Sequence, residues 1–85
     1  MTEFPAQDMK IEVDDKQLGL VLRAMRVAAN KTQSELARGM CISRDSIANM
    51  ETGRGLVSLT TLVRAGEICE FEVKLVVSRK KEVAA

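Results

Sequence analysis

Few side chains in this sequence could take part in covalent or metal chemistry. The 85 residues include no His, so the side chain most often used as a general base and as a metal ligand is missing. The two cysteines, Cys41 and Cys69, are far apart and form no CxxC pair of the kind that holds structural zinc. We therefore expect no enzymatic activity, no catalytic residue, no metal site and no cofactor, and a binding or regulatory role instead.

The polar side chains whose spacing suits recognition lie in the segment that follows Ser43, a residue type that often starts a helix. Ile47 and Met50 would form the buried side of that helix, and its outer face would carry Arg44, Asp45, Ala48 and Asn49. Arg can donate two hydrogen bonds to guanine, Asn can pair in the same way with adenine, and Ala leaves room for a thymine methyl. A carboxylate near phosphates is repelled unless it meets a cytosine amino group or a neighbouring Arg. Taken alone, such a face is usually a solvated polar surface, and it becomes a candidate for reading base pairs only as part of a complete DNA-binding motif.

Charge is divided unevenly along the chain, although its net value is only +1. Residues 1–22 hold five acidic and two basic side chains, whereas residues 23–55 hold six basic and three acidic ones. Residues 56–85 hold five basic and four acidic side chains. A basic middle behind an acidic start favours an anionic partner, but the excess is small.

Length and composition are typical of one small globular domain, with 46% hydrophobic and 29% charged residues. No apolar run approaches the roughly 18 residues that a membrane helix needs. The start, MTEFPAQDMK, lacks the apolar centre of a signal peptide. We expect a cytoplasmic protein without a membrane partner.

Capping signals and apolar spacing predict two helices in the first half of the chain. Asp14, with Gln17 three residues later, begins a helix that ends near Asn30. Its buried residues would be Leu18, Val21, Leu22, Met25 and Ala29. The sequence Thr-Gln-Ser-Glu at 32–35 is a capping box that opens a second, shorter helix. That helix would bury Leu36, Ala37 and Met40.

Two further helices follow. The one that starts after Ser43 would end at the glycine-containing sequence 51–55. Ser58 would cap a fourth helix, whose inward residues would be Leu59, Leu62, Val63 and Ile68.

Two segments alternate apolar and polar residues and so predict strands. Residues Met9–Val13 would form a short one, and Phe71–Ser78 a longer one with Phe71, Val73, Leu75 and Val77 on a single face. A lone strand needs a pairing partner, which is either the 9–13 segment or the same strand of a second copy. The predicted organisation is a loose start at 1–8, a domain at 9–70, a dimerisation strand at 71–79 and a tail at 80–85.

The two short helices joined by a tight turn form a helix-turn-helix. This motif resembles the Cro/cI-type (XRE) DNA-binding family. The matching sequences are TQSELA at 32–37, ISRDSIAN at 42–49 and METGR at 50–54, together with Leu18-Gly19 and Arg23-Ala-Met-Arg26 upstream. The resemblance covers residues 17 to about 70. It implies a mainly α, lambda-repressor-like bundle of about four helices, whose second motif helix enters the major groove while the first lies across the phosphates.

The resemblance also assigns roles to individual residues. The outer face, Arg44, Asp45, Ala48 and Asn49, would contact bases. Gln33 would help to fix a phosphate at a helix start, where free amides and the helix dipole favour an anion. Further phosphate contacts by position would be Ser34, Lys31, Ser43 and Arg54. Arg26 and Glu51 match the family's structural ion pair, which would hold the recognition helix at its angle.

Two positions depart from the family pattern. Cys41 stands where the family usually has Gly, because the backbone of that turn has a positive φ. Either Cys41 is strained there or the turn is altered. Lys31 replaces the usual apolar residue before the capping box.

A single recognition helix reaches only a few base pairs, so repressors of this kind bind as homodimers to near-palindromic DNA. The sequence Ser-Leu-Thr-Thr-Leu at 58–62 followed by the 71–78 strand resembles the HipB-like antitoxins. The implied function is that of a dimeric transcriptional repressor that binds a specific sequence in double-stranded DNA. The narrower implied role is an autoregulating antitoxin with a toxin protein as its partner. A phage or restriction-modification regulator without a toxin is the alternative. A protein-interaction module that has lost DNA binding is an alternative of another class.

Overall fold

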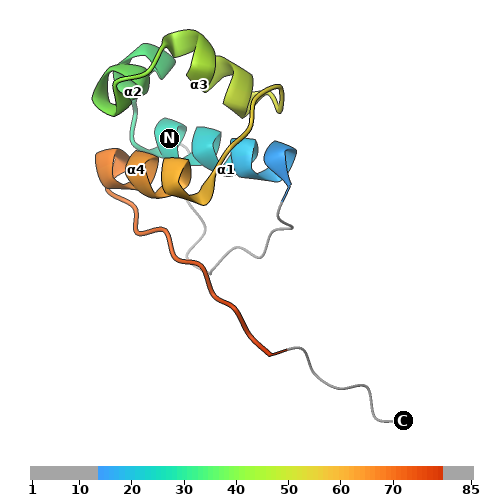
Figure 1. Cartoon of the computed structure of the whole chain (residues 1–85). Helices are drawn as coiled ribbons and strands as arrows, with labels where there is room; N and C mark the ends of the chain where they lie inside the picture. Colours follow the sequence, from blue (N-terminus) through green and yellow to red (C-terminus); the bar gives the residue numbers. More distant parts are fainter. Residues whose placement is uncertain (1–13, 80–85) are drawn as a thin grey trace.

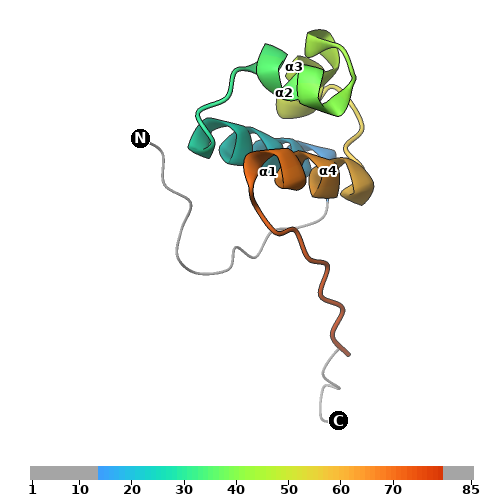
Figure 2. The same cartoon turned by 90° about the vertical axis from the view of Figure 1, so that its left-hand side faces the viewer.

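The computed structural model describes residues 14–79, which form four α-helices. They are α1 (Asp15–Ala28), α2 (Gln33–Met40), α3 (Arg44–Glu51) and α4 (Leu59–Cys69). Helices α1 and α4 lie side by side in one layer, and α2 and α3 lie together across them (Figures 1 and 2). The predicted four-helix architecture is confirmed. None of these helices is long and apolar enough to cross a membrane.

Each helix begins at a residue whose side chain caps it, as the sequence predicted. The Asp14 carboxylate accepts from the Gln17 amide at 2.7 Å. In the capping box of α2, the Thr32 hydroxyl accepts from the Glu35 amide at 3.0 Å and the Glu35 carboxylate accepts from the Thr32 amide at 2.9 Å. This second bond lowers the pKa of Glu35. Ser43 and Ser58 cap α3 and α4 in the same way.

The turn between α2 and α3 keeps the conformation that usually requires Gly. Cys41 ends α2 with φ 58° and ψ 39°, so the left-handed backbone is retained and the residue bears the strain. Asn30 has φ 57° just after α1, as its residue type predicted.

The core lies where the four helices meet, and its members are Leu22, Met25, Leu36, Ala37, Met40, Ile47, Met50, Val57, Leu62, Ala65 and Cys69. The predicted buried faces of α2 and α3 are confirmed. In α4 the prediction was partly wrong, because Leu59 is 40% exposed. The inward face of α4 consists mainly of small residues, Ala65, Gly66 and Cys69, with Leu62.

Residues 71–79 form no strand, and neither does any other part of the described chain. Phe71 and Val73 are half-buried against the protein's own core, whereas Leu75, Val76 and Val77 are exposed. The segment leaves the end of α4 and extends away from the helices (Figure 1). A single copy of the chain offers it no strand partner among the described residues, and the 9–13 segment lies outside them.

Gly66 lets the first residues of this segment pack directly on α4. A Cβ at this position would lie 2.8 Å from the Phe71 carbonyl oxygen and 2.8 Å from Val73 Cγ2. Because the first of these atoms is backbone, we expect Gly66→Ala to displace residues 71–73. The free energy of unfolding should fall by about 1–2 kcal/mol, and trypsin should cleave faster after Lys74.

Gly55→Ala is the matched control for this substitution. A Cβ there would meet its neighbours at 3.5 Å, an ordinary contact distance. Proteolysis at Lys74 that is equally fast in both variants would show that Gly66 does not hold the segment.

Candidate nucleic-acid interface

The second helix of the motif presents a polar outer face to solvent. Arg44, Asp45 and Asn49 are exposed and Ala48 is half-buried, while Ile47, Met50 and Glu51 point into the protein. All four residues predicted to contact bases therefore lie outside the core, although Ala48 is only partly exposed. Helix α3 has two turns, enough to place both Arg44 and Asn49 along one groove.

Arg44 and Asp45 lie next to each other at the start of α3. Arg44 Nη1 is 3.4 Å from Asp45 Oδ1, and the two side chains are 60% and 85% exposed. An exposed pair of this length contributes little to stability, so the guanidinium is available to another acceptor. The Asp45 carboxylate would be repelled by DNA phosphates unless it met a cytosine amino group or a neighbouring Arg. Arg44 is such a neighbour.

The start of α2 offers backbone donors beside α3. The capping box satisfies the amides of Thr32 and Glu35, and the Leu36 amide donates to the Thr32 carbonyl at 3.0 Å. Within the described residues, no acceptor lies against the amides of Gln33 and Ser34, which are the first two of the helix. Free amides at the positive end of a helix dipole suit a phosphate.

The remaining predicted phosphate contacts differ in their surroundings. Lys31 is half-buried in the loop before α2, and Ser34 is exposed. The Ser43 hydroxyl already caps the Ser46 amide at 3.1 Å and lies 2.8 Å from the Ser46 hydroxyl. Arg54 is exposed beyond the end of α3, and its backbone amide donates to the Asn49 carbonyl at 2.8 Å.

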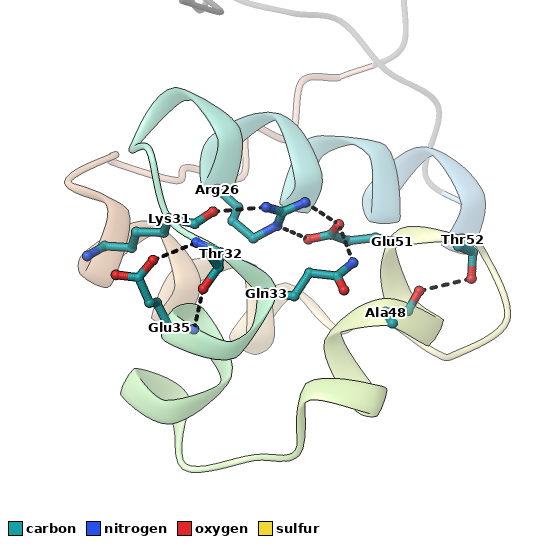
Figure 3. A network of polar contacts seen from close by, with 8 residues as sticks. All are labelled: Arg26, Lys31, Thr32, Gln33, Glu35, Ala48, Glu51 and Thr52. Carbon is teal, nitrogen blue, oxygen red and sulfur yellow. Dashed lines mark hydrogen bonds and ion pairs between the residues drawn. The ribbon is translucent and has the colours of Figure 1, made fainter.

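Arg26 and Glu51 form a two-pronged contact between α1 and the end of α3 (Figure 3). Arg26 Nε donates to Glu51 Oε2 at 2.6 Å and Nη2 donates to Oε1 at 2.9 Å. Arg26 Nη1 also donates to the Lys31 carbonyl at 2.9 Å, which ties in the loop before α2. The hydrogen bonds to Glu51 raise the pKa of Arg26. The Glu51 side chain is only 3% exposed, so this contact places a charged pair inside the protein.

A further contact of this carboxylate was not predicted from the sequence. Gln33 Nε2 donates to Glu51 Oε1 at 3.2 Å, so a side chain assigned to phosphate binding is bonded to the buried ion pair (Figure 3). The sequence did contain a sign that Glu51 is buried and needs partners. The spacing of Ile47, Met50 and Glu51 places all three on the inner side of α3.

Two residues with hydroxyl groups beside the outer face were also not predicted from the sequence as part of the site. Ser46 is exposed on α3 and bonded to Ser43. Thr52 donates its hydroxyl to the carbonyls of Ala48 at 2.9 Å and Asn49 at 3.2 Å, and so caps the end of the helix. Within residues 14–79, no three His, Cys, Asp or Glu side chains gather closely enough to hold a metal ion.

Comparisons with known proteins agree with this geometry. The family model of the helix-turn-helix domain matches residues 17–76. The structure of the clp gene regulator ClgR from C. glutamicum is 29% identical, with a TM-score of 0.64, and the match covers 69% of this chain and 76% of that one. A chain of the HipA-HipB-O2-O3 complex is 25% identical, also with a TM-score of 0.64, and the match covers 84% of this chain and all of that one. No curated protein matches the sequence.

These matches confirm the resemblance to Cro/cI-type and HipB-like proteins that the motif residues indicated. The family match spans well over half of the chain. It includes α1 from Gln17 onward and all of α2, α3 and α4, and with them the exposed outer face of α3 and the capped start of α2. The chain belongs to the helix-turn-helix domain family.

Proposed function

We propose that this protein is a sequence-specific transcriptional repressor that binds double-stranded DNA as a homodimer, on a near-palindromic operator. The observation that carries the proposal is the outer face of α3, where Arg44, Asp45 and Asn49 are exposed on the second helix of a helix-turn-helix. In this arrangement the face enters the major groove, and the start of α2 lies against the phosphates.

The proposed contacts divide into two kinds. Arg44 and Asn49 read bases, because each can make a bidentate pair with a purine edge. Asp45 orients Arg44 or accepts from a cytosine amino group, and Ala48 accommodates a thymine methyl. The phosphate contacts come from Gln33, Ser34, Lys31, Ser43 and Arg54, which set the position on the duplex without reading its sequence.

Two arginines test this division. Arg44→Ala should weaken binding to the selected operator by about 1–3 kcal/mol and relax the preference at one base pair of each half-site. Arg54→Ala should weaken binding to operator and random DNA alike. Because a dimer would lose two phosphate contacts, the slope of log K against log salt should become less negative by about 2. The affinities of both variants for operator and random DNA are measured by fluorescence anisotropy over a series of salt concentrations.

Arg23→Ala is the control, since it also removes one positive charge. Arg23 is exposed on α1, which is neither helix of the motif, and it lies among Leu20, Ala24 and Val27. Its loss should leave both the base preference and the salt slope nearly unchanged. A wild-type protein without salt-sensitive affinity for DNA from its own promoter would favour the interaction module that has lost DNA binding.

We further propose that the segment after α4 forms the dimer by pairing with its symmetry mate. Three consecutive apolar side chains, Leu75, Val76 and Val77, are 63%, 79% and 85% exposed, which supports burial against another chain. Phe71 and Val73, which were also assigned to the dimer face, pack instead on their own core. In this proposal they anchor the strand, and the residues beyond Val73 pair.

Replacing Leu75 with Pro tests the strand pairing. Proline lacks the amide that a strand donates and should shift the sedimentation equilibrium toward monomer. Leu75→Ala, which keeps the amide, should weaken the dimer less. An unchanged dimer mass for Leu75→Pro would contradict pairing through this segment.

The narrower role that we propose is that of an autoregulating antitoxin with a toxin protein as its partner. It is supported by the match to a chain of the HipA-HipB-O2-O3 complex, which extends beyond the four helices of this chain. The product of the adjacent gene, co-expressed with this protein, should purify with it as a complex and be inhibited by it. Without such a neighbouring gene product, a phage or restriction-modification regulator is the better assignment.

A further inference from the structure

The buried carboxylate of Glu51 connects the two helices of the motif as well as α1 and α3. Its Oε1 accepts from Arg26 Nη2 at 2.9 Å and from Gln33 Nε2 at 3.2 Å, while its Oε2 accepts from Arg26 Nε at 2.6 Å (Figure 3). The side chain is 3% exposed. Because Arg26 holds both oxygens, the position of the carboxylate is fixed before any ligand arrives.

This fixed charge decides how the Gln33 amide is turned. A glutamine amide can offer either its oxygen or its nitrogen to a neighbour. Beside a carboxylate only the nitrogen is favourable, since the oxygen would be repelled. The amide nitrogen therefore faces Glu51, and its oxygen lies on the far side (Figure 3). One N–H is used by Glu51. The second N–H has no acceptor within residues 14–79, and neither do the backbone amides of Gln33 and Ser34.

We propose that Glu51 is a positioning residue for phosphate binding, which holds the Gln33 amide so that its second N–H donates to a DNA phosphate at the start of α2. The inference rests on the proposed function, because it assumes that this helix start lies against DNA. Glu51 touches no DNA itself. Its carboxylate belongs to the last residue of α3, so the phosphate contact on α2 is complete only when α3 is correctly seated.

Amide-proton exchange of the free wild-type protein tests the positioning step without DNA. In NMR spectra, one of the two side-chain amide protons of Gln33 should exchange with water at least about tenfold more slowly than those of Gln17. Gln17 is a suitable reference because its side-chain amide has no partner within the described residues. Equally fast exchange of the Gln33 and Gln17 protons would overturn the inference.

A double-mutant cycle tests the consequence for DNA, using a duplex that the wild-type protein selects from random sequences. Gln33→Ala should weaken binding about tenfold, the effect of one hydrogen bond to a charged group. In the Arg26→Met/Glu51→Met background, an apolar replacement of the ion pair, the same substitution should weaken binding less than about twofold. Gln17→Ala, the matched control, should change neither affinity. An equal loss from Gln33→Ala in both backgrounds would overturn the positioning role.

The two measurements separate this inference from the proposed function. A wild-type protein that selects no duplex refutes DNA binding, whatever the exchange data show. A protein that selects a duplex but gives unprotected Gln33 protons refutes only the role of Glu51. If the double-Met variant does not fold, as judged by circular dichroism, the exchange measurement decides.

Discussion

Replacing Gly19 with Ala is expected to lower the free energy of unfolding by about 2–3 kcal/mol. Helices α1 and α3 meet here with their backbones in contact, and an added methyl group would overlap the Met50 carbonyl oxygen. A backbone atom cannot rotate away as a side chain can, so the two helices must separate. The expected loss already allows for the gain in helix propensity of about 1 kcal/mol that Ala brings. For a domain of this size it corresponds to a fall in Tm of roughly 10–20 °C.

Gly39→Ala provides the control for that substitution. Gly39 also lies within a helix, but the nearest atoms to a Cβ there would all belong to the Ile68 side chain, with Cδ1 at 3.1 Å and Cγ2 at 3.4 Å. A side chain can move by a few tenths of an ångström, so the free energy of unfolding should change by less than about 1 kcal/mol. Equal effects of the two substitutions in urea denaturation would contradict a backbone contact between α1 and α3 at Gly19.

Glu51→Ala is expected to have the largest effect on stability, a loss of about 3–5 kcal/mol in urea denaturation. Removing the carboxylate leaves the Arg26 guanidinium, whose side chain is 14% exposed, without its counter-charge. The guanidinium stays charged because its pKa is already high, so it must be hydrated at the expense of packing. Loss of the carboxylate also releases the end of α3, which it joins to α1.

The Arg26→Met/Glu51→Met double variant separates the charge effect from packing. An apolar pair of similar volume should recover most of the stability lost by Glu51→Ala, because no unpaired charge remains inside the protein. A double variant as unstable as the single one would show that the ion pair itself is required. A loss below about 1 kcal/mol for Glu51→Ala would contradict the burial of this pair.

The helices were predictable from the sequence because their signals are local. Asp14, the Thr32 capping box, Ser43 and Ser58 each lie within a few residues of the amides they bind, so the sequence contains the whole interaction. The left-handed backbone at Asn30 could be anticipated for the same reason, whereas at Cys41 it was suggested only by the Gly that the family usually has there. The outer face of α3 followed from helical periodicity alone.

The contacts that the sequence did not predict join residues far apart in the chain. Gln33 and Glu51 meet only because α2 and α3 pack across each other, and the Arg64 guanidinium reaches the Met40 carbonyl at 2.8 Å for a similar reason. In α4 the predicted inner face was only partly right. Leu62 is buried as predicted, but Leu59 is exposed, and the small residues Ala65 and Gly66 are buried instead. Residues 71–79, which the alternating pattern predicted as a strand, form none in a single copy of the chain, and the pairing that we propose for them would need a second copy.

The central claim, that the outer face of α3 reads DNA as one of two symmetry-related copies, is tested most directly by selecting bound duplexes from random DNA. The expected sequences contain two inverted half-sites with centres about 10–10.5 base pairs, or a multiple of that distance, apart. Selection with Arg44→Ala should lose the preference at one position in each half-site. Selected pools without inverted half-sites, or with a pattern that Arg44→Ala leaves unchanged, would contradict the claim.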